Sequence, residues 1–254
     1  MSDMDLACSI ISMIDLTNLN DDCNAADIDA LCATALGNDI RPATAAVCVW
    51  PRFVAQSKKA LAASAVRVAT VVNFPKGGTD TAAVVGETVD VLKAGADEID
   101  LVFPYRAWTL GDVDTATEQV AAVRAVIDQP AQLKVILETG ELANEDLIRS
   151  ASLMCIDEGA DFIKTSTGKV AENATLESAR IMLSAIAESG QSVGFKPAGG
   201  IRTFDEAKAH LELASSILGE GWASPHTYRF GASSLLASVE AVLTGSEAAP
   251  TGGY

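Results

Sequence analysis

The chain has 254 residues, 49% of them hydrophobic, which is enough for a large buried core, and a formal net charge of −16 at pH 7. This surplus of acid argues against a nucleic-acid or anionic-membrane partner, although local lysines can still bind a phosphate inside an acidic protein. No run approaches the ~18 apolar residues that a membrane-spanning helix needs, and no basic N-terminal segment precedes a long apolar stretch. We therefore expect a cytoplasmic protein.

The spacing of cysteine and histidine makes two further kinds of site unexpected. The five cysteines form no CxxC pair and no even framework, and His210 and His226 lie in no ligand-spaced cluster. We expect neither disulfides nor a bound metal. Cys48 lies two residues before Trp50. It is interpreted as a small buried hydrophobe, because the sequence offers no neighbouring base that would make its thiol reactive.

Short apolar or β-branched runs, typical of buried strands, recur along the chain. They cover residues 11–16, 45–50, 67–74, 98–103, 133–139, 162–166, 193–196 and 228–232. Alanine-rich amphipathic stretches between them predict helices, several of which open on a polar residue suited to capping. These helices cover residues 80–94, 114–127, 144–158, 175–188 and 205–218.

The alternation of strands and helices decides the expected fold. Strand followed by helix, repeated over ~250 residues, predicts an α/β protein with a single-domain (β/α)8 TIM barrel. We expect the barrel in residues 1–244 and a flexible C-terminal tail in residues 245–254. Two small domains would also suit the length, but no linker marks a boundary. A doubly wound sheet is the other alternative, and the first strand is not followed by a glycine-rich dinucleotide fingerprint.

Two lysines occur in runs where burial would make a charge costly. Lys164 lies in the sixth run and Lys196 in the seventh. A buried ammonium must be paired or shift its pKa, although a lysine at a strand end can also extend to water. A second ammonium ~4 Å away, at an effective dielectric of ~20, costs ~4 kcal/mol, enough to lower a lysine pKa by ~3 units. The pair therefore favours Schiff-base catalysis, with one amine attacking a carbonyl beside a charged neighbour.

Strand parity decides whether these side chains meet. If Lys164 points into the barrel with Phe162 and Ser166, the alternate residues face the helices. Asp100, in the fourth run, can then anchor the charged lysine and relay protons through water. Lys134, early in the fifth run, is either a further electrostatic neighbour or a residue at the strand start, and the sequence leaves both open.

The loops after the last three predicted strands contain anion-binding groups. Glycine lets backbone N–H groups approach an oxyanion, and a helix N-terminus favours negative charge. Because barrels often hold phosphate after strands seven and eight, the pattern predicts a phosphate site. The candidate residues are Thr165, Gly168, Lys169, Gly199, Gly200, Arg202, Gly231, Ser233 and Ser234.

The motifs, taken in order, resemble those of the deoxyribose-phosphate aldolases over almost the whole chain. The matching segments are residues 15–17, 45–53, 73–75, 95–104, 133–139, 162–168, 194–202 and 229–234. The resemblance implies a class I aldolase, without metal or other cofactor, that reversibly cleaves 2-deoxyribose 5-phosphate to acetaldehyde and glyceraldehyde 3-phosphate.

The same resemblance implies residue roles. Lys164 is the Schiff-base lysine, Lys196 the neighbouring cation and Asp100 the proton-transfer carboxylate, while Asp15, Thr17 and Lys134 join the substrate-site residues. A homodimer is also implied, as is proton transfer at the C2 carbon of the enamine by Tyr254. The last predicted helix would run ~18 Å from the catalytic face, and ten extended residues can return ~33 Å, so the tail can reach the site.

Two other functions remain open at this point. One is another Schiff-base barrel, such as a transaldolase-like enzyme acting on a different phosphorylated sugar. The other is a catalytically silent barrel that binds a phosphosugar, although a pure binder has no need of two desolvated lysines.

Overall fold

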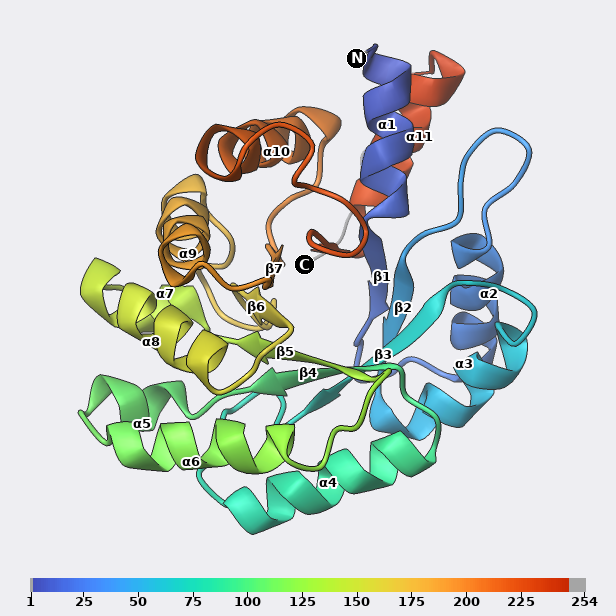
Figure 1. Cartoon of the computed structure of the whole chain (residues 1–254). Coiled ribbons are helices and arrows are strands. Elements are labelled where there is room, and N and C mark those ends of the chain that lie inside the picture. The colour runs from blue at the N-terminus through green and yellow to red at the C-terminus, as the bar shows by residue number, and fades with distance from the viewer. Residues whose placement is uncertain (1, 247–254) are drawn as a thin grey trace.

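Eight parallel strands form a barrel with helices on its outer surface (Figure 1). The structure, a computed structural model, describes residues 2–246. The strands are β1 (Ile14–Asn18), β2 (Ala46–Val49), β3 (Arg67–Val72), β4 (Glu98–Val102), β5 (Gln132–Ile136), β6 (Phe162–Lys164), β7 (Gly194–Lys196) and β8 (Phe230–Ala232). They are hydrogen-bonded in the order β7-β6-β5-β4-β3-β2-β1-β8. The predicted single-domain barrel is confirmed.

The barrel closes between β7 and β8 through scattered main-chain hydrogen bonds instead of a regular ladder. Arg229 N donates to Phe195 O at 3.0 Å, and Gly231 N donates to Pro197 O at 2.9 Å. Isolated parallel bridges join Phe195 to Tyr228 and Ala198 to Gly231. This closure brings the loops that follow β7 and β8 side by side.

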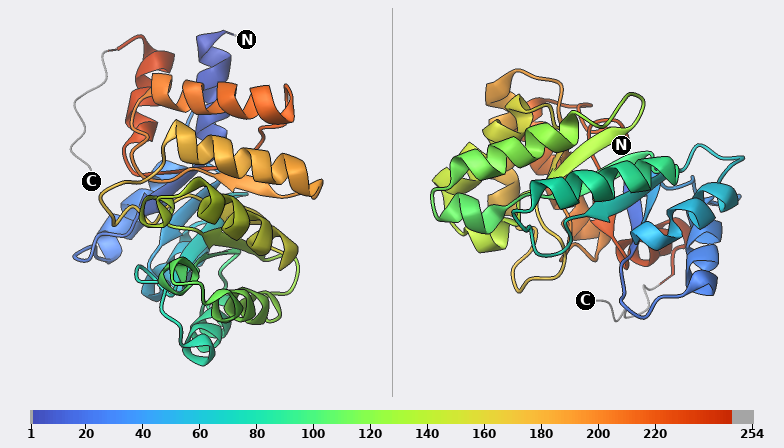
Figure 2. Two further views of the ribbon diagram at one scale, coloured as in Figure 1. Left: turned by 90° about the vertical axis from the view of Figure 1, so that its left-hand side faces the viewer. Right: turned by 90° about the horizontal axis from the view of Figure 1, so that it is seen from below.

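Helices surround the barrel, as Figure 2 shows from two further directions. They are α1 (Asp3–Ser12), α2 (Ala25–Ala35), α3 (Val54–Ala60), α4 (Thr81–Lys93), α5 (Tyr105–Thr109), α6 (Val113–Arg124), α7 (Thr139–Leu142), α8 (Glu145–Asp157), α9 (Leu176–Ser189), α10 (Phe204–Leu218) and α11 (Leu235–Thr244), with a 3-10 turn, η1 (Pro51–Phe53). All the predicted helices are present, with small shifts of their ends. Within residues 2–246 no helix is long and apolar enough to cross a membrane.

Some predicted boundaries are wrong, for local reasons. Ile11, expected in the first strand, lies in α1, because Ser2 and Asp5 form a capping box that starts a helix nearby. Thr139, expected at the end of the fifth strand, instead opens α7, because Glu138 adopts a left-handed conformation that turns the chain. The predicted helix ranges contain no counterpart of α1, α2, α3, α5 and α7.

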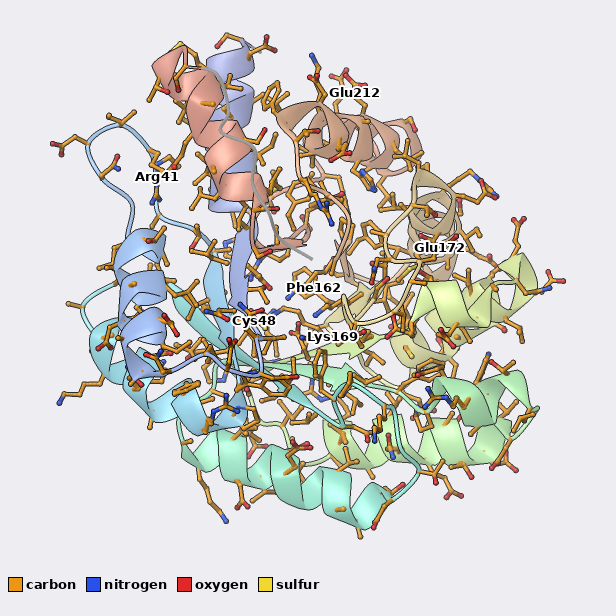
Figure 3. All side chains as sticks on the ribbon, turned by 180° about the vertical axis from the view of Figure 1, so that it is seen from behind. Arg41, Cys48, Phe162, Lys169, Glu172 and Glu212 are labelled. Atoms are coloured by element: carbon orange, nitrogen blue, oxygen red, sulfur yellow. The ribbon has the colours of Figure 1, made fainter. Side chains whose placement is uncertain are left out.

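Side chains alternate between the barrel interior and the layer beneath the helices. Ile163 packs into the main apolar core, whereas Cys48, Ala69 and Val71 form a separate small cluster. The Arg229 guanidinium carbon lies 5.5 Å from the centroid of the Phe162 ring. Figure 3 places Cys48 and Phe162 inside the ring of helices and Glu212 outside it. Phe162 and Lys164 therefore share the inward face, as expected from parity.

Candidate active site

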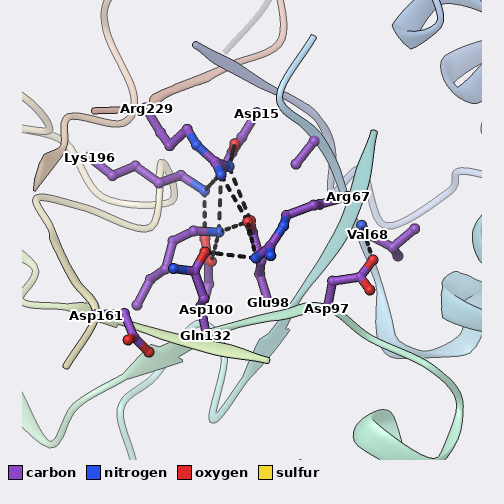
Figure 4. Close-up of polar contacts among 12 residues, drawn as sticks. Asp15, Arg67, Val68, Asp97, Glu98, Asp100, Gln132, Asp161, Lys196 and Arg229 are labelled. Atoms are coloured by element: carbon purple, nitrogen blue, oxygen red, sulfur yellow. Dashed lines mark hydrogen bonds and ion pairs between the residues drawn. The ribbon is translucent and has the colours of Figure 1, made fainter. Parts of the chain in front are cut away.

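Seven charged side chains form one buried ion-pair cluster inside the barrel, drawn in part in Figure 4. The acidic members are Asp15, Glu98 and Asp100, and the basic members are Lys134, Lys164, Lys196 and Arg229. An unpaired charge in a protein interior costs several kcal/mol, so groups buried this deeply are expected to pair with one another. The strands supply them from different sides of the barrel, so the cluster exists only in the closed fold.

Asp100 connects the two lysines that the sequence pairs. Its Oδ2 accepts hydrogen bonds from Lys164 Nζ and from Lys196 Nζ, each at 2.8 Å. The two lysines lie opposite each other in the register of β6 and β7. The side chain of Lys164 is 5% exposed, whereas those of Lys196 and Asp100 are fully buried. Lys164 is thus the member of this trio that a substrate can reach.

Lys134 and Asp15 lie deeper in the same cluster. Lys134 Nζ lies 2.5 Å from Glu98 Oε2 and 3.1 Å from Asp100 Oδ1. Asp15 Oδ2 lies 2.5 Å from Lys196 Nζ. Both side chains are fully buried, so Lys134 is an electrostatic neighbour of the trio and not a lysine that extends to water from a strand start.

Arg229 and Glu98 were given no role by the sequence analysis, yet they complete the cluster. Arg229 Nη2 donates to Glu98 Oε1 at 2.9 Å, and Arg229 Nη1 donates to Asp15 Oδ1 at 2.7 Å. Glu98 lies two residues before Asp100 on β4 and therefore shares its inward face. This spacing of two residues from Asp100 was the sequence signal that could have identified Glu98 as an inward-facing residue.

The pKa of Lys164 moves in the opposite direction to those of the two neighbouring lysines. Burial lowers the pKa of Lys164, the Asp100 carboxylate opposes this shift, and the Lys196 ammonium lowers the pKa further. Burial also acts to lower the pKa of Lys196, but Asp100 and Asp15 outweigh it and raise that pKa; Lys134 is raised in the same way. The lowered pKa of Lys164 therefore comes first from burial, and the expected repulsion by Lys196 adds to it.

Charge balance agrees with a neutral Lys164 amine. Burial would raise the pKa of Asp100, but Lys134, Lys164 and Lys196 hold it well below its usual range. The pKa values of Asp15 and Glu98 are lowered as well, because their basic neighbours outweigh burial. Among the seven buried groups, a neutral Lys164 leaves three carboxylates and three cations, and the partly exposed Arg67 adds a further ion pair to Glu98 at 3.4 Å.

A cavity of about 300 Å³ contains the exposed tip of Lys164. Its lining includes these predicted residues: Thr17, Lys164, Gly168, Gly199, Gly200, Arg202, Gly231, Ser233 and Ser234. It also includes Leu19, Thr167, Glu172 and Asn173, which the sequence analysis did not single out. The cavity thus brings together the loops that follow β6, β7 and β8.

Other predicted site residues lie outside this lining. Asp15, Asp100, Lys134 and Lys196 are buried in the ion-pair cluster. Thr165 Oγ1 donates to Ala198 O at 3.3 Å, and Lys169 Nζ donates to Leu19 O at 2.9 Å. Tyr254 and the rest of the predicted tail beyond Ser246 are outside the described residues.

Two glycines of the lining are required by their surroundings. A Cβ on Gly231 would lie 2.7 Å from Ala198 Cβ and 3.1 Å from Lys196 Cε, so a larger residue would clash with Ala198 and press on the buried lysine. Gly199 has a φ of +78°, and a Cβ there would lie 2.8 Å from Asn173. Both positions therefore favour a bare backbone beside the cavity.

The N-terminus of α11 contributes to the same lining. Ser234 is its N-cap residue, and both Ser233 and Ser234 line the cavity, together with the exposed Arg202. Free N–H groups and the helix dipole at such an end attract anions, as does a guanidinium. The cavity therefore combines an amine with groups suited to an anion. Within residues 2–246, no group of three or more His, Cys, Asp or Glu residues is arranged to hold a metal ion.

Comparison with known proteins agrees on one family. A model described as DeoC/LacD family aldolase matches residues 9–241. A deoxyribose-phosphate aldolase of Agrobacterium fabrum is 55% identical over 243 residues, which are 94% of this chain and 92% of that protein. A solved structure from Coccidioides immitis has 30% identity and a TM-score of 0.80, covering 93% of this chain and 86% of the other. One from Toxoplasma gondii has 26% identity and a TM-score of 0.85, covering 97% and 99%. Both structures are provisionally named deoxyribose-phosphate aldolases.

Proposed function

The chain belongs to the DeoC/LacD family of aldolases, and from that membership we propose that it is a deoxyribose-phosphate aldolase, a carbon-carbon lyase. It reversibly cleaves 2-deoxy-D-ribose 5-phosphate to acetaldehyde and D-glyceraldehyde 3-phosphate through a lysine Schiff base. The observation that carries the proposal is one cavity lined by Lys164, whose pKa is lowered, by the glycine loops after β6 and β7, and by the N-terminus of α11.

The reaction begins at Lys164. An ordinary lysine has a pKa of ~10.4, so well under ~1% of it is neutral at pH 7, and a lowered pKa increases the nucleophilic fraction. The neutral amine adds to the C1 carbonyl of the open-chain sugar, and the resulting carbinolamine takes up one proton and loses water, which gives a protonated imine. Lys196 remains charged beside it, because Asp100 and Asp15 raise its pKa.

Carbon-carbon cleavage follows from the imine. As the C3 hydroxyl loses its proton, the electrons of the C2–C3 bond move to C2, which leaves an enamine on Lys164 and releases glyceraldehyde 3-phosphate. Protonation at C2 and hydrolysis then release acetaldehyde. Asp100 lies 2.8 Å from Lys164 Nζ and is placed to hold and relay protons through water. Because the protonated imine is itself the electron sink, this chemistry needs no metal or organic cofactor.

The expected partners and location follow from the same proposal. The ligands are a phosphorylated sugar and aldehydes, with neither nucleic acid nor membrane as a partner for this acidic chain. We further propose a cytoplasmic homodimer whose subunits each contain a barrel and a C-terminal tail, and sedimentation of the purified protein would test the assembly.

Borohydride trapping tests the function directly. Treatment with acetaldehyde and borohydride should give a stable mass gain on Lys164, located by peptide mass spectrometry. A gain only with larger ketoses would indicate a transaldolase-like enzyme instead. No gain with any carbonyl compound would indicate a protein that binds phosphosugars without catalysis.

A substitution at Ser234 tests the phosphate site. Ser234→Asp should raise the KM for deoxyribose 5-phosphate by roughly 10²-fold or more, because like charges ~4 Å apart at a dielectric of ~20 repel by ~4 kcal/mol. Aspartate is a good N-cap, so α11 should still form. The KM for unphosphorylated deoxyribose should change much less, and Ser150→Asp, at an exposed position of α8, is the matched charge control. Equal effects on both sugars would place the phosphate elsewhere.

Tyr254 is proposed to assist proton transfer at C2 of the enamine. Tyr254→Phe should then slow the exchange of solvent hydrogen into bound acetaldehyde by ~10²-fold, the effect of losing one general acid-base group. Trapping at Lys164 should persist. Deuterium incorporation followed by NMR measures the exchange, and a wild-type rate in the variant would remove Tyr254 from the mechanism.

A further inference from the structure

The pairing between the β5 and β6 segments slips by one residue just beyond the two strands. Leu137 N donates to Lys164 O at 2.9 Å, whereas Thr139 N donates to Thr165 O, also at 2.9 Å. Two steps along one segment therefore match one step along the other, which makes Glu138 the extra residue of a β-bulge. The bulge lies directly opposite the peptide that follows Lys164.

Glu138 has an unusual backbone for its type. Its φ is 55° and its ψ is 60°, in the left-handed region that residues other than glycine seldom adopt. Bulges next to active sites commonly redirect a side chain, and strained residues persist where surrounding contacts hold them. The contacts of the Glu138 carboxylate are therefore the place to look for a role.

That carboxylate holds the loop that continues from Lys164. Glu138 Oε1 accepts a hydrogen bond from Thr167 N at 3.1 Å, and Oε2 accepts one from Thr167 Oγ1 at 2.6 Å. Thr167 Oγ1 in turn accepts one from Lys169 N at 3.0 Å. Glu138 is fully buried, and Thr167 and Gly168 line the cavity. One buried carboxylate thus fixes both the main chain and the side chain of the cavity wall.

Different contacts hold Lys164 and the loop around Gly168 in place on the two sides of the cavity. Lys164 is held by the β6 ladder and by its hydrogen bond to Asp100. Gly168 has no such strand pairing, and its neighbours Thr167 and Lys169 are tied to Glu138 directly or through the Thr167 hydroxyl. Loss of the Glu138 carboxylate should therefore disturb the loop more than the amine.

We propose that Glu138 is a positioning residue that acts through Thr167 to shape the loop of residues 165–169, and thereby the fit of the phosphorylated end of the substrate. This inference rests on the proposed function, because it requires imine formation at Lys164 and phosphate binding in the same cavity. Glu138 itself touches no reacting atom. Glu138 also lies close enough to Lys164 for that ammonium to act on the pKa of its carboxyl group, so the trapping of an imine at Lys164 has to be measured in every variant.

Glu138→Gln is the first test, because it keeps the size of the side chain but removes the charge and leaves one acceptor oxygen for two donors, Thr167 N and the Thr167 hydroxyl. The KM for deoxyribose 5-phosphate should rise on the order of 10-fold or more, as expected for loss of a hydrogen bond to a charged acceptor. The KM for unphosphorylated deoxyribose and the borohydride trapping of acetaldehyde at Lys164 should stay close to wild type. Glu141→Gln, which changes an exposed carboxylate of α7, is the matched control.

Three further variants separate this role from a merely structural one. Glu138→Gly accommodates the left-handed backbone but removes the anchor, so it should show the same selective loss as Glu138→Gln. Thr167→Val should reproduce that loss, and Thr167→Ser should recover most of the selectivity. The double variant Glu138→Gln/Thr167→Val should be no worse than the more impaired single variant, because both remove one interaction.

The outcomes separate this inference from the proposed function. Equal KM changes for the two sugars, no change in KM, or a wild-type Glu138→Gly enzyme would overturn the positioning role. If Glu138→Gln does not fold, the Thr167→Val and Thr167→Ser pair decides by the same comparison of sugars. Failure of the wild-type enzyme to trap acetaldehyde at Lys164 would instead refute the proposed function.

Discussion

Lys164→Ala is expected to lower turnover on the order of 10⁵-fold, comparable to the loss of other enzymatic nucleophiles, and to abolish borohydride trapping with acetaldehyde. The fold should remain intact. Removing Lys164 leaves Asp15, Glu98 and Asp100 matched by Lys134, Lys196 and Arg229, so no buried charge loses its only partner.

The measurements are turnover of deoxyribose 5-phosphate, mass spectrometry of the trapped protein, and circular dichroism with thermal unfolding. Lys59→Ala, at an exposed position of α3, controls for loss of a lysine and should behave as wild type. A Lys164→Ala protein that still traps acetaldehyde on another lysine would show that the imine forms elsewhere.

Lys196→Leu is expected to slow the reaction at neutral pH and to move the rising limb of the pH–rate profile to higher pH. Lys164 acts as the neutral amine, so the rate rises as pH increases through its pKa. The Lys196 ammonium lowers that pKa, and its removal therefore raises it. The loss also leaves the three carboxylates with Lys134 and Arg229 as their other buried cations and Arg67 at the edge of the cluster, which favours a charged Lys164.

The rising limb of the pH–rate profile is expected to move by about 1–3 pH units in Lys196→Leu. This range follows from a repulsion of up to ~4 kcal/mol between ammonium groups ~4 Å apart at a dielectric of ~20. Part of the lost rate should return at alkaline pH. Lys196→Arg retains the charge and should keep the limb near its wild-type position, even where its bulk lowers the rate. A slowed Lys196→Leu enzyme with an unchanged pH profile would contradict the electrostatic role.

The barrel, and the burial of Lys164 beside Asp100 and Lys196, could be predicted because both depend on local patterns. Alternating strands and helices indicate the fold, and parity along β4, β6 and β7 places Asp100, Lys164 and Lys196 on inward faces. Glycines after the last strands indicate the cavity in the same way. In each instance a short stretch of sequence contains the signal.

The remaining features depend on contacts between distant segments or run against local preference. The pair formed by Arg229 and Glu98 joins positions 131 residues apart across the barrel, and no local pattern specifies that partnership. Glu138 takes a backbone conformation that its residue type disfavours, so propensity predicts a continuing strand where the chain turns. The sequence also could not show that burial contributes more than repulsion by Lys196 to the lowered pKa of Lys164, because that comparison depends on how deeply the side chain is buried.

The ion-pair cluster also limits how this protein can diversify. Many barrels fill their interior with interchangeable aliphatic layers, whereas here the same space holds charges that act on the pKa of Lys164. An inward substitution on β1, β4, β5 or β7 therefore alters the chemistry as well as the packing. New substrate ranges are accordingly more accessible through the surface loops after β6, β7 and β8, where shape can change while the charge arrangement below is preserved.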